Sequence, residues 1–286
     1  MILAAALATL AIIGVTGPAV EWKSLEIGME LTWLAAKSPS PIGDSRITVV
    51  RVDPKIWKLD LLSASVSGEP EGMTAREWAR NNDLAVATNA GMFGSDYKTH
   101  VGYMECRGHI NSKRVNHYQS IAAFDARHPE TQPPFHIFDL DDPDITVQAI
   151  RKQYASLVQN LRLVKRPGRN RWRDSNMQWS EVALGEDDEG KILLIYSRSP
   201  FSMHDLNEEL LSAGFGLVAL QHLEGGPEAQ IYLSAGDTKL ELFGSYETSF
   251  RKDDENSNAC PIPNVLGVRR KTVGSRGAYP KGDSHR

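Results

Sequence analysis

The chain has 286 residues, of which 41% are hydrophobic, and its formal net charge is −4. This length and apolar content are sufficient for a substantial core, and one domain of about 250 residues is within the normal range. The slightly negative charge gives no reason to expect nucleic acid binding.

The N-terminal residues predict export. Residues 1–13 are almost wholly apolar, and residues 14–20 bring small side chains before the polar segment Glu21-Trp22-Lys23. The apolar run is too short for a comfortable membrane span, and small residues are typical of a signal-peptide cleavage site. We therefore expect residues 1–20 to be a signal peptide or an N-terminal anchor in contact with a membrane, and the protein to be periplasmic or secreted. No Lys or Arg stands near Met1, so an uncleaved anchor or a misplaced start codon stays open.

A first strand, helix and strand are predicted between residues 52 and 93. Residues 52–62 predict strands, Thr74-Ala75-Arg76-Glu77 fits a capping box that begins a short helix, and residues 84–88 predict a further strand. Asn89-Ala90-Gly91-Met92-Phe93 follows this strand directly. Glycine allows a sharp turn and the close approach of a ligand, so we expect Asn89 and Gly91 at a strand end beside a ligand. The alternative is that Asn89 only stabilises its own turn.

A second strand, helix and strand of the same design are predicted between residues 191 and 227. Residues 191–197 predict a strand, Ser202-Met203-His204-Asp205 fits a capping box for a helix over 202–213, and residues 217–223 predict the next strand. Leu223-Glu224-Gly225-Gly226-Pro227 then places a carboxylate before two glycines. A glycine-flanked carboxylate at a strand end has no evident structural task, so Glu224 is the leading candidate for a functional residue.

The ends of these predicted strands lead to one site. Crossover connections place ligands outside the carboxyl ends of the strands, where Glu224, Asn89 and Arg198 would gather. The beginning of the second helix, with Ser202 and His204, faces the same place and presents free N–H groups to an anion. Because Arg198 adds a full positive charge, we expect a ligand that bears a phosphate or a carboxylate.

We expect a single mixed α/β (α+β) domain over residues 21–270, with a mixed, largely antiparallel β-sheet, β-hairpins and a few βαβ crossovers. Residues 271–286 lack apolar periodicity, and we expect a disordered tail there. Cys106 and Cys260 are the only cysteines. An exported chain would allow a disulfide between them, and two buried free thiols are the alternative.

The chain resembles the phosphodiester glycosidases over residues 47–270. The resemblance is carried by the order and spacing of short segments, which are NAGMF at 89–93 followed by Val101-Gly102-Tyr103, a hairpin strand over 161–164, Ala183-Leu184-Gly185, and LEGGP at 223–227 followed by Ala229. Members of this family are mixed α/β domains that cleave a sugar from a sugar-1-phosphodiester and leave a free sugar and a phosphomonoester. The resemblance implies a hydrolase of this kind.

Three positions depart from the pattern of the family. Glu224 stands where the family has Asp, which keeps the carboxylate and extends it by one methylene group. Glu181 stands where the family has an arginine, two residues before Ala183, so a positive charge expected to hold phosphate is replaced by a negative one. Pro227-Glu228 replaces a Gly-Ser pair. These changes bear on the substrate and on whether the chain is active.

Glu224 and Asn89 are the expected catalytic residues. We expect Glu224 to act as base or nucleophile at the anomeric carbon and Asn89 to orient sugar hydroxyls. A phosphodiester leaving group departs as a weakly basic anion, so stabilising its charge matters more than protonating it. The expected substrate-binding residues are Arg198, Gly91, Gly225, Gly226, Ser202, His204 and His222.

Glycoside cleavage usually needs a second carboxyl group. The sequence leaves this group open among Asp96, Glu105, Glu181 and Glu228. No organic cofactor is implied, no residue is assigned to a metal, and a metal stays open.

The sequence thus predicts an exported hydrolase that cleaves the sugar to phosphate bond of sugar-1-phosphodiesters in envelope or extracellular glycans. The alternative is a secreted carbohydrate-binding module that keeps the family fold without cleaving its ligand, which Glu181 and Pro227-Glu228 support. The expected partner is a glycan or sugar-phosphodiester substrate, and the oligomeric state stays open.

Overall fold

The computed structural model describes residues 20–68 and 72–271. Their secondary structure is mostly β, with eighteen strands, four α-helices and one 3₁₀ helix. The strands form three sheets, and every paired strand within them is antiparallel to its neighbour. The expected signal peptide, apart from Val20, and the expected tail, apart from Lys271, lie outside the described residues.

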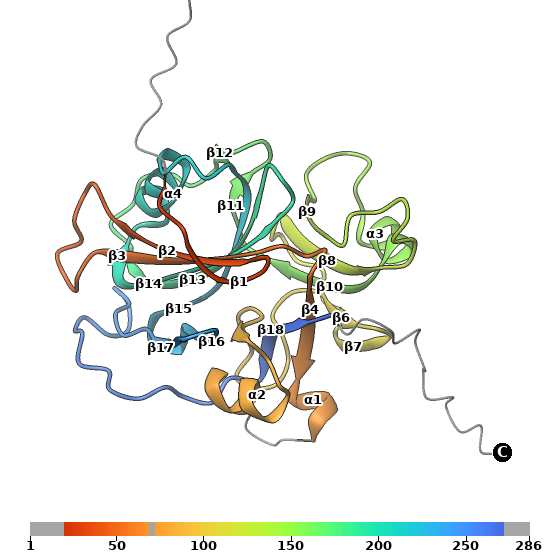
Figure 1. The fold of residues 1–286 in the computed structure, drawn as a ribbon, viewed down its shortest axis with the longest axis horizontal. Coiled ribbons are helices and arrows are strands. Elements are labelled where there is room, and N and C mark those ends of the chain that lie inside the picture. Colours follow the sequence, from red (N-terminus) through yellow and green to blue (C-terminus); the bar gives the residue numbers. More distant parts are fainter. Residues whose placement is uncertain (1–19, 69–71, 272–286) are drawn as a thin grey trace, which may run out of the picture.

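The largest sheet has eight strands and carries Glu224 on an inner strand (Figure 1). In spatial order they are β1 (Lys23–Glu26), β2 (Met29–Ala35), β3 (Arg46–Val52), β14 (Ile192–Phe201), β13 (Trp179–Asp187), β15 (Leu217–Gly225), β11 (Arg162–Lys165) and β12 (Arg169–Asn170).

The two smaller sheets have five strands each. The second sheet is ordered β7 (His109–Ser112), β6 (Met104–Cys106), β10 (Tyr154–Asn160), β8 (Ser120–Ala126) and β9 (Phe135–Asp139). The third sheet is ordered β17 (Thr238–Phe243), β16 (Gln230–Ala235), β5 (Val86–Asn89), β18 (Asn264–Arg270) and β4 (Trp57–Ser63).

The helices are short. They are α1 (Ala64–Ser67), α2 (Ala75–Asn81), α3 (Val147–Gln153), α4 (Met203–Ser212) and the 3₁₀ helix η1 (Gly226–Glu228). The two helices predicted from capping sequences begin where those sequences indicate. Thr74 and Glu77 form a capping box at α2, and the Ser202 side chain accepts a hydrogen bond from the N–H of Asp205 at α4.

The expected α/β class is wrong, because the domain is mostly β. Both predicted crossovers are present, but a third strand lies between the two parallel strands of each. Antiparallel β13 separates β14 from β15, and antiparallel β18 separates β4 from β5. This insertion turns each expected parallel pair into a purely antiparallel ladder. Sequence periodicity reports which segments are strands, but the partner of a strand is decided by distant residues.

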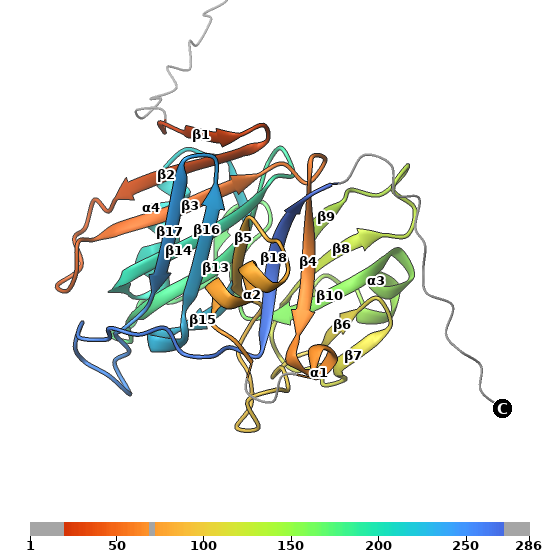
Figure 2. The ribbon, with the colours of Figure 1, turned by 60° about the horizontal axis from the view of Figure 1, so that its bottom comes forward.

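The main core lies between the eight-stranded sheet and the two smaller sheets. Figure 2 shows β16 and β17 crossing over β14 and β13, and α4 covers the opposite face of the same sheet (Figure 1). Neighbouring residues of β13 follow this division, since Val182 packs into the main core and Ala183 packs under α4. The two faces of β13 and β15 therefore have different surroundings, which decides what each side chain of the site contacts.

Candidate active site

Glu224 lies at an irregular point of β15. In a regular strand, His222 and Glu224 would point to the same face of the sheet. Here His222 is opposite Ala183 and Glu224 is opposite Val182, so Leu223 is an extra residue and forms a β-bulge. The bulge places Glu224 on the face of Val182, toward the space between the sheets, and leaves His222 on the face that α4 covers.

Asn89, the last residue of β5, joins the two glycine turns. Its Nδ2 donates to the carbonyl oxygen of Glu228 at 3.0 Å, and its Oδ1 accepts from the N–H of Gln230 at 2.8 Å. The turn at Asn89 and the turn at Glu224 are therefore in contact in the structure. The sequence predicted this contact, because both turns follow predicted strands whose ends lead to one site. Both ends of the Asn89 amide are used in holding the segment that follows Glu224, which makes Asn89 a positioning residue for the Glu224 turn.

Packing explains why glycine occupies both turns. Gly91 has a φ of +150°, and a Cβ at this position would lie 2.3 Å from Oδ1 of Asn160 and 2.4 Å from Cε1 of His100. Gly226 has a φ of +63°, and a Cβ there would lie 2.9 Å from Oε2 of Glu247. The glycines thus allow polar side chains of the protein to approach both turns closely.

Buried polar side chains fill the interior between the two turns. Ser120 donates to Oε1 of Gln221 at 3.0 Å, and Nδ2 of Asn160 donates to the carbonyl of Ala90 at 3.0 Å. Nε2 of Gln221, Oδ1 of Asn160 and Nδ1 of His100 are buried without a hydrogen-bond partner among the described residues. Because buried polar atoms are nearly always hydrogen-bonded, these three atoms are exceptions, and their residues are at most 1% exposed.

Glu181 and His222 form a buried ion pair on the α4 side of the sheet. Nδ1 of His222 lies 2.8 and 2.9 Å from the two carboxylate oxygens of Glu181, and Nε1 of Trp179 donates to Glu181 at 2.6 Å. Burial alone would lower the pKa of His222, but the charge of Glu181 and its hydrogen bond outweigh this and raise it. Trp179 also packs on Gly225, where a Cβ would lie 2.7 Å from its ring. Both members of the pair are covered by protein, so they act on a ligand only through their neighbours.

The environment of Glu224 is different. Among the described residues, no cationic side chain forms an ion pair with its carboxyl group. Its carboxyl group accepts only the N–H of Gly225, at 3.2 Å. The residue keeps some solvent contact, but its carboxyl group lies deep among protein atoms. Burial raises the pKa of Glu224 to about 8, and the nearby carboxylates of Glu228 and Glu181 add to the rise. Glu224 is therefore mainly protonated at neutral pH.

The structure separates the four candidates for a second carboxyl group. Glu228 and Glu181 lie close enough to influence the charge state of Glu224. Glu105 lies on β6 and is ion-paired with an arginine of α3, and Asp96 is exposed and accepts hydrogen bonds within its own turn. Because Glu181 is held in the buried pair, the partly exposed Glu228 is the better placed of the two, and burial raises its pKa as well.

Sequence reasoning missed two groups at this site, Tyr118 and Arg114. Burial raises the pKa of Tyr118, and the charges of Arg114 and Glu224 act on its hydroxyl with opposite signs. Tyr118 therefore lies within electrostatic range of both Arg114 and Glu224. The side chain of Arg114 is exposed, and no ion pair is recorded for it within the described part of the chain. The adjacent basic residues Lys113 and Arg114 are the only sequence signal, and they form no motif.

Arg198 holds a loop in place. Its Nε and Nη2 donate to the side chain and backbone of Asp254 at 2.6 and 2.9 Å, and Nη1 donates to the carbonyl of Phe243 at 2.7 Å. A further bond joins Nη2 to the carbonyl of Asn256. These contacts tie the segment after β17 to β14, so the guanidinium serves the protein rather than an anion beside Glu224.

The beginning of α4 does not face Glu224. Ser202 is buried and caps the helix, and Nδ1 of His204 lies 2.9 Å from the carbonyl oxygen of Trp172. The helix covers the face of the sheet that is opposite to the face of Glu224 (Figure 1). The structure thus does not bring Ser202 and His204 together with Glu224 and Asn89.

The two cysteines are free thiols in the structure. Sγ of Cys106 donates to the carbonyl of Leu61 at 3.2 Å, and Cys260 lies beside Gln230. Residues 20–68 and 72–271 contain no group of three metal-ligating side chains that could hold an ion. Within the same ranges, no helix has the length and apolar character that a membrane crossing requires.

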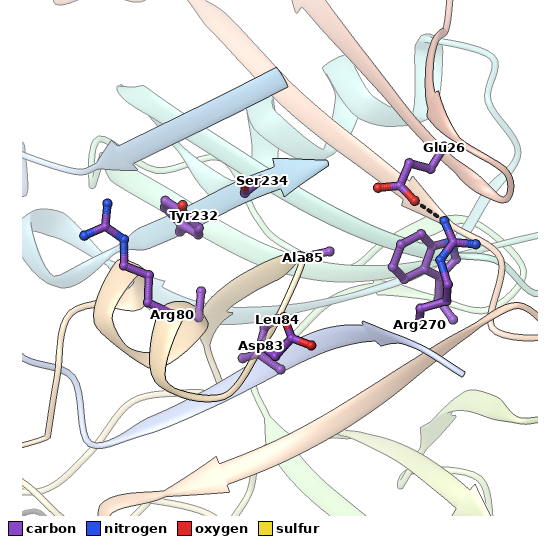
Figure 3. Close-up of a pocket in the computed structure, with 10 residues that line it drawn as sticks. Glu26, Arg80, Asp83, Leu84, Ala85, Tyr232, Ser234 and Arg270 are labelled. Atoms are coloured by element: carbon purple, nitrogen blue, oxygen red, sulfur yellow. Dashed lines mark hydrogen bonds and ion pairs between the residues drawn. The ribbon is translucent and has the colours of Figure 1, made fainter. Parts of the chain in front are cut away.

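A separate hollow of about 350 Å³ lies at the other end of the third sheet (Figure 3). Arg270 pairs with Glu26 at one side of it and stacks on Trp57, with 4.7 Å between guanidinium and ring, while Arg80 lies across the hollow. None of the sequence-predicted site residues lines this hollow.

Comparisons with known proteins agree with this arrangement of strands. The sequence model of the phosphodiester glycosidase family matches residues 82–269. No curated protein sequence matches the chain.

The catalytic domain of zebrafish N-acetylglucosamine-1-phosphodiester alpha-N-acetylglucosaminidase, auto-inhibited by its pro-peptide, is similar in structure with a TM-score of 0.58 and 14% identity, over 90% of this chain and 85% of that one. A hypothetical protein from Synechocystis has a TM-score of 0.55 and 14% identity, over 89% of this chain and 64% of that one. At these identities the two structures show likeness of fold.

Proposed function

We propose, since this chain belongs to the phosphodiester glycosidase family, that it hydrolyses the sugar to phosphate bond of sugar-1-phosphodiesters. Membership of the family supports a glycosidase-type function. The particular substrate, export from the cytoplasm and action on envelope or extracellular glycans are part of the proposal.

The observation that best supports the proposal is the state of Glu224. A β-bulge places Glu224 on the face of Val182, toward the space between the sheets, and burial raises its pKa to about 8. A carboxyl group that keeps its proton at neutral pH is suited to donate that proton to a leaving oxygen. We therefore assign Glu224 as the general acid, rather than as the base or nucleophile that the sequence alone indicates.

Glu228 is the proposed base that activates water. It follows the glycine pair, and the hydrogen bond from Asn89 to its carbonyl fixes its backbone. Two carboxyl groups on one turn, with burial raising the pKa of Glu224 to about 8, fit the pair of carboxyl groups that glycoside hydrolysis uses. Asn89 contributes by holding this turn.

Arg114 is the proposed contact for the phosphate. Its charge acts on Tyr118, as does the charge of Glu224, and its guanidinium is exposed. An arginine side chain forms strong, charge-assisted hydrogen bonds with phosphate oxygens. This replaces the expected role of Arg198, whose nitrogens bind the loop after β17.

The direct test is release of free sugar by the purified protein. The panel is UDP-sugars and methyl phosphodiesters of GlcNAc, glucose and mannose, with the plain methyl glycosides alongside and Glu224→Gln protein as the blank. We expect release from at least one phosphodiester and much less from the plain glycosides. Retention of glycans on an array without any hydrolysis would favour the carbohydrate-binding module instead. Faster cleavage of plain glycosides would refute the phosphate assignment.

A further inference from the structure

A cleft lies on the same face of the eight-stranded sheet as Glu224. It is enclosed by β2, β3 and β14 below and by β17 and the loop after it above, and its volume is about 450 Å³. This volume is within the range of small-molecule binding sites. The residues that matter for its chemistry are Trp33, Arg46, Tyr196, Arg198, Phe243 and Asp254.

The cleft and Glu224 lie along one row of cross-strand neighbours. Trp33 pairs with Thr48, Thr48 with Tyr196, Tyr196 with Val182, and Val182 with Glu224. Cross-strand neighbours share a face, and four strand spacings give a separation of about 19 Å between the ends of the row. Val182, which lies between Tyr196 and Glu224 in this row, is completely buried, so protein separates the cleft from Glu224.

The charges of the cleft are balanced. Arg198 is paired with Asp254 at 2.6 Å, and Arg46 is paired with Asp44 at 3.6 Å. A third carboxylate, Glu241, also lines the cleft. Positive charge is therefore not in excess, and an anionic ligand would gain little from this site. Paired arginine and aspartate side chains offer donors and acceptors side by side, which suits a ligand that carries hydroxyl groups.

The aromatic side chains supply flat apolar surface. The side chain of Trp33 is 41% exposed, although a tryptophan usually buries most of its ring. The ring of Phe243 forms part of the opposite wall, under the guanidinium of Arg198. A sugar ring has the matching character, with C–H groups on its faces and hydroxyl groups around its rim. Tryptophan is suited to such a ligand because its large rigid ring loses little entropy on binding.

Tyr196 provides an independent indication of a ligand. The residue is only 3% exposed and lines the cleft, and its hydroxyl makes no hydrogen bond of normal geometry among the described residues, although the Arg198 guanidinium lies close to it. A buried hydroxyl without a partner is costly and calls for an explanation. A ligand in the cleft would supply the missing hydrogen-bond partner once the side chains around the hydroxyl move slightly to admit it.

We propose that this cleft is a second carbohydrate-binding site, separate from the hydrolytic site, which binds one unit of a neutral glycan between Trp33 and Phe243. The site concerns binding alone and does not depend on turnover at Glu224. In a glycan-cleaving enzyme it would hold a long substrate on the protein while Glu224 acts on another part of the same chain.

The test is binding of neutral trisaccharides to the full-length protein by titration with NMR detection. Chitotriose, mannotriose and maltotriose are the probes, and inorganic phosphate is the anionic comparison. We expect at least one trisaccharide to bind, with an affinity that falls at least tenfold in Trp33→Ala. Binding should persist in Glu224→Gln and in Phe250→Ala, a matched control because Phe250 is 75% exposed and does not line the cleft. The proposal fails if none of the trisaccharides binds, if Trp33→Ala binds as wild type does, or if phosphate displaces the sugar.

Tyr196→Phe tests the hydroxyl. The substitution removes a group that makes no hydrogen bond, so we expect the melting temperature to be unchanged or slightly higher. Affinity for the trisaccharide should fall about fivefold, the loss typical of one neutral hydrogen bond. Unchanged affinity would exclude the hydroxyl and overturn this geometry of binding. Hydrolysis of a methyl phosphodiester should be equal in wild type and Trp33→Ala, so loss of binding and loss of catalysis can be told apart.

Discussion

The two crossover units of this protein share a topology and differ in chemistry. In each, short capped helices connect two parallel strands (α1 and α2 in the first unit, α4 in the second), an antiparallel strand lies between these strands, and a glycine turn follows the second strand. In the first unit, β5 ends regularly and both amide atoms of Asn89 bind the protein. In the second unit, β15 ends in a bulge, and the Glu224 carboxyl accepts only a neighbouring N–H.

This comparison separates structural from reactive groups. A polar side chain with every hydrogen bond satisfied by protein contributes to stability, whereas a buried carboxyl group with little compensation has a shifted pKa and is available for chemistry. The Asn89 turn therefore stabilises the fold, and the Glu224 turn carries the reactive group. Substitutions in the first turn should mainly lower stability, and substitutions in the second should mainly lower activity.

The largest expected effect is the loss of activity in Glu224→Gln. The amide keeps the shape of the side chain but cannot exchange a proton, so we expect kcat/KM for the best phosphodiester to fall at least about 100-fold, as for removal of a general acid or base. Free-sugar release measures the rate, and circular dichroism checks the fold. The matched control is Glu130→Gln, an exposed glutamate whose side chain is 67% accessible, which should keep wild-type activity. Activity within about tenfold of wild type in Glu224→Gln would move the catalytic role elsewhere.

Asn89→Ala should affect stability first. It leaves the N–H of Gln230 and the carbonyl of Glu228 without their partner, and we expect the free energy of unfolding to fall by about 2 kcal/mol. For a domain of this size the melting temperature should fall by roughly 4–8 °C. Thermal unfolding followed by circular dichroism measures the shift. Asn81→Ala is the control, because Asn81 is exposed and is the last residue of α2. An unchanged melting temperature would show that Asn89 does not support the turn.

Arg114→Gln should weaken substrate binding. We expect KM for a phosphodiester to rise about tenfold, equal to about 1.4 kcal/mol, because an exposed charge-assisted contact with phosphate is lost. The neighbouring Lys113→Gln is the matched control and should leave KM within about twofold. Equal effects of the two substitutions would indicate general attraction of an anion and would contradict a specific contact.

A further effect concerns pH. Folding raises the pKa of Glu224 from an ordinary value near 4.5 to about 8, so the folded protein holds a proton that the unfolded chain releases between these values. The contribution of Glu224 to the free energy of unfolding therefore decreases as pH rises through this range. Glu224→Gln lacks this dependence, and its melting temperature relative to wild type should be higher at pH 8 than at pH 5.

The same pKa predicts the activity profile. If Glu224 is the general acid, kcat/KM should fall as pH rises above about 8. A rise of kcat/KM with pH through this value would instead assign Glu224 as the base. A melting-temperature difference that is the same at pH 5 and pH 8 would contradict the raised pKa itself.

Local sequence signals predicted two helices and two glycine turns correctly. Capping residues identified α2 and α4, and glycines after apolar runs identified both turns. These signals are readable because their physical causes lie within a few residues of one another. The meeting of Asn89 with the Glu224 turn follows from the two similar crossovers.

The rest depends on residues that are distant in the sequence. Arg198 binds Asp254 and Asn256 across a loop, and no local pattern indicates that its charge is already used. Glu181 finds His222 on the neighbouring strand, which explains how a carboxylate is tolerated where the family has an arginine. The bulge at Leu223 is invisible in the sequence, because it appears only when β15 is aligned with β13.

The position of β18 has a consequence for how the protein is made. This strand is among the last described residues, yet it lies in the third sheet between β4 and β5, and Val265 pairs directly with Asn89. During synthesis, β4 and β5 leave the ribosome long before their common neighbour exists. Contacts between such distant segments form slowly and expose unpaired strand edges in the meantime. A nascent chain that stopped before residue 264 would contain Glu224, both glycine turns and α4, and would still lack the strand that holds Asn89 in place.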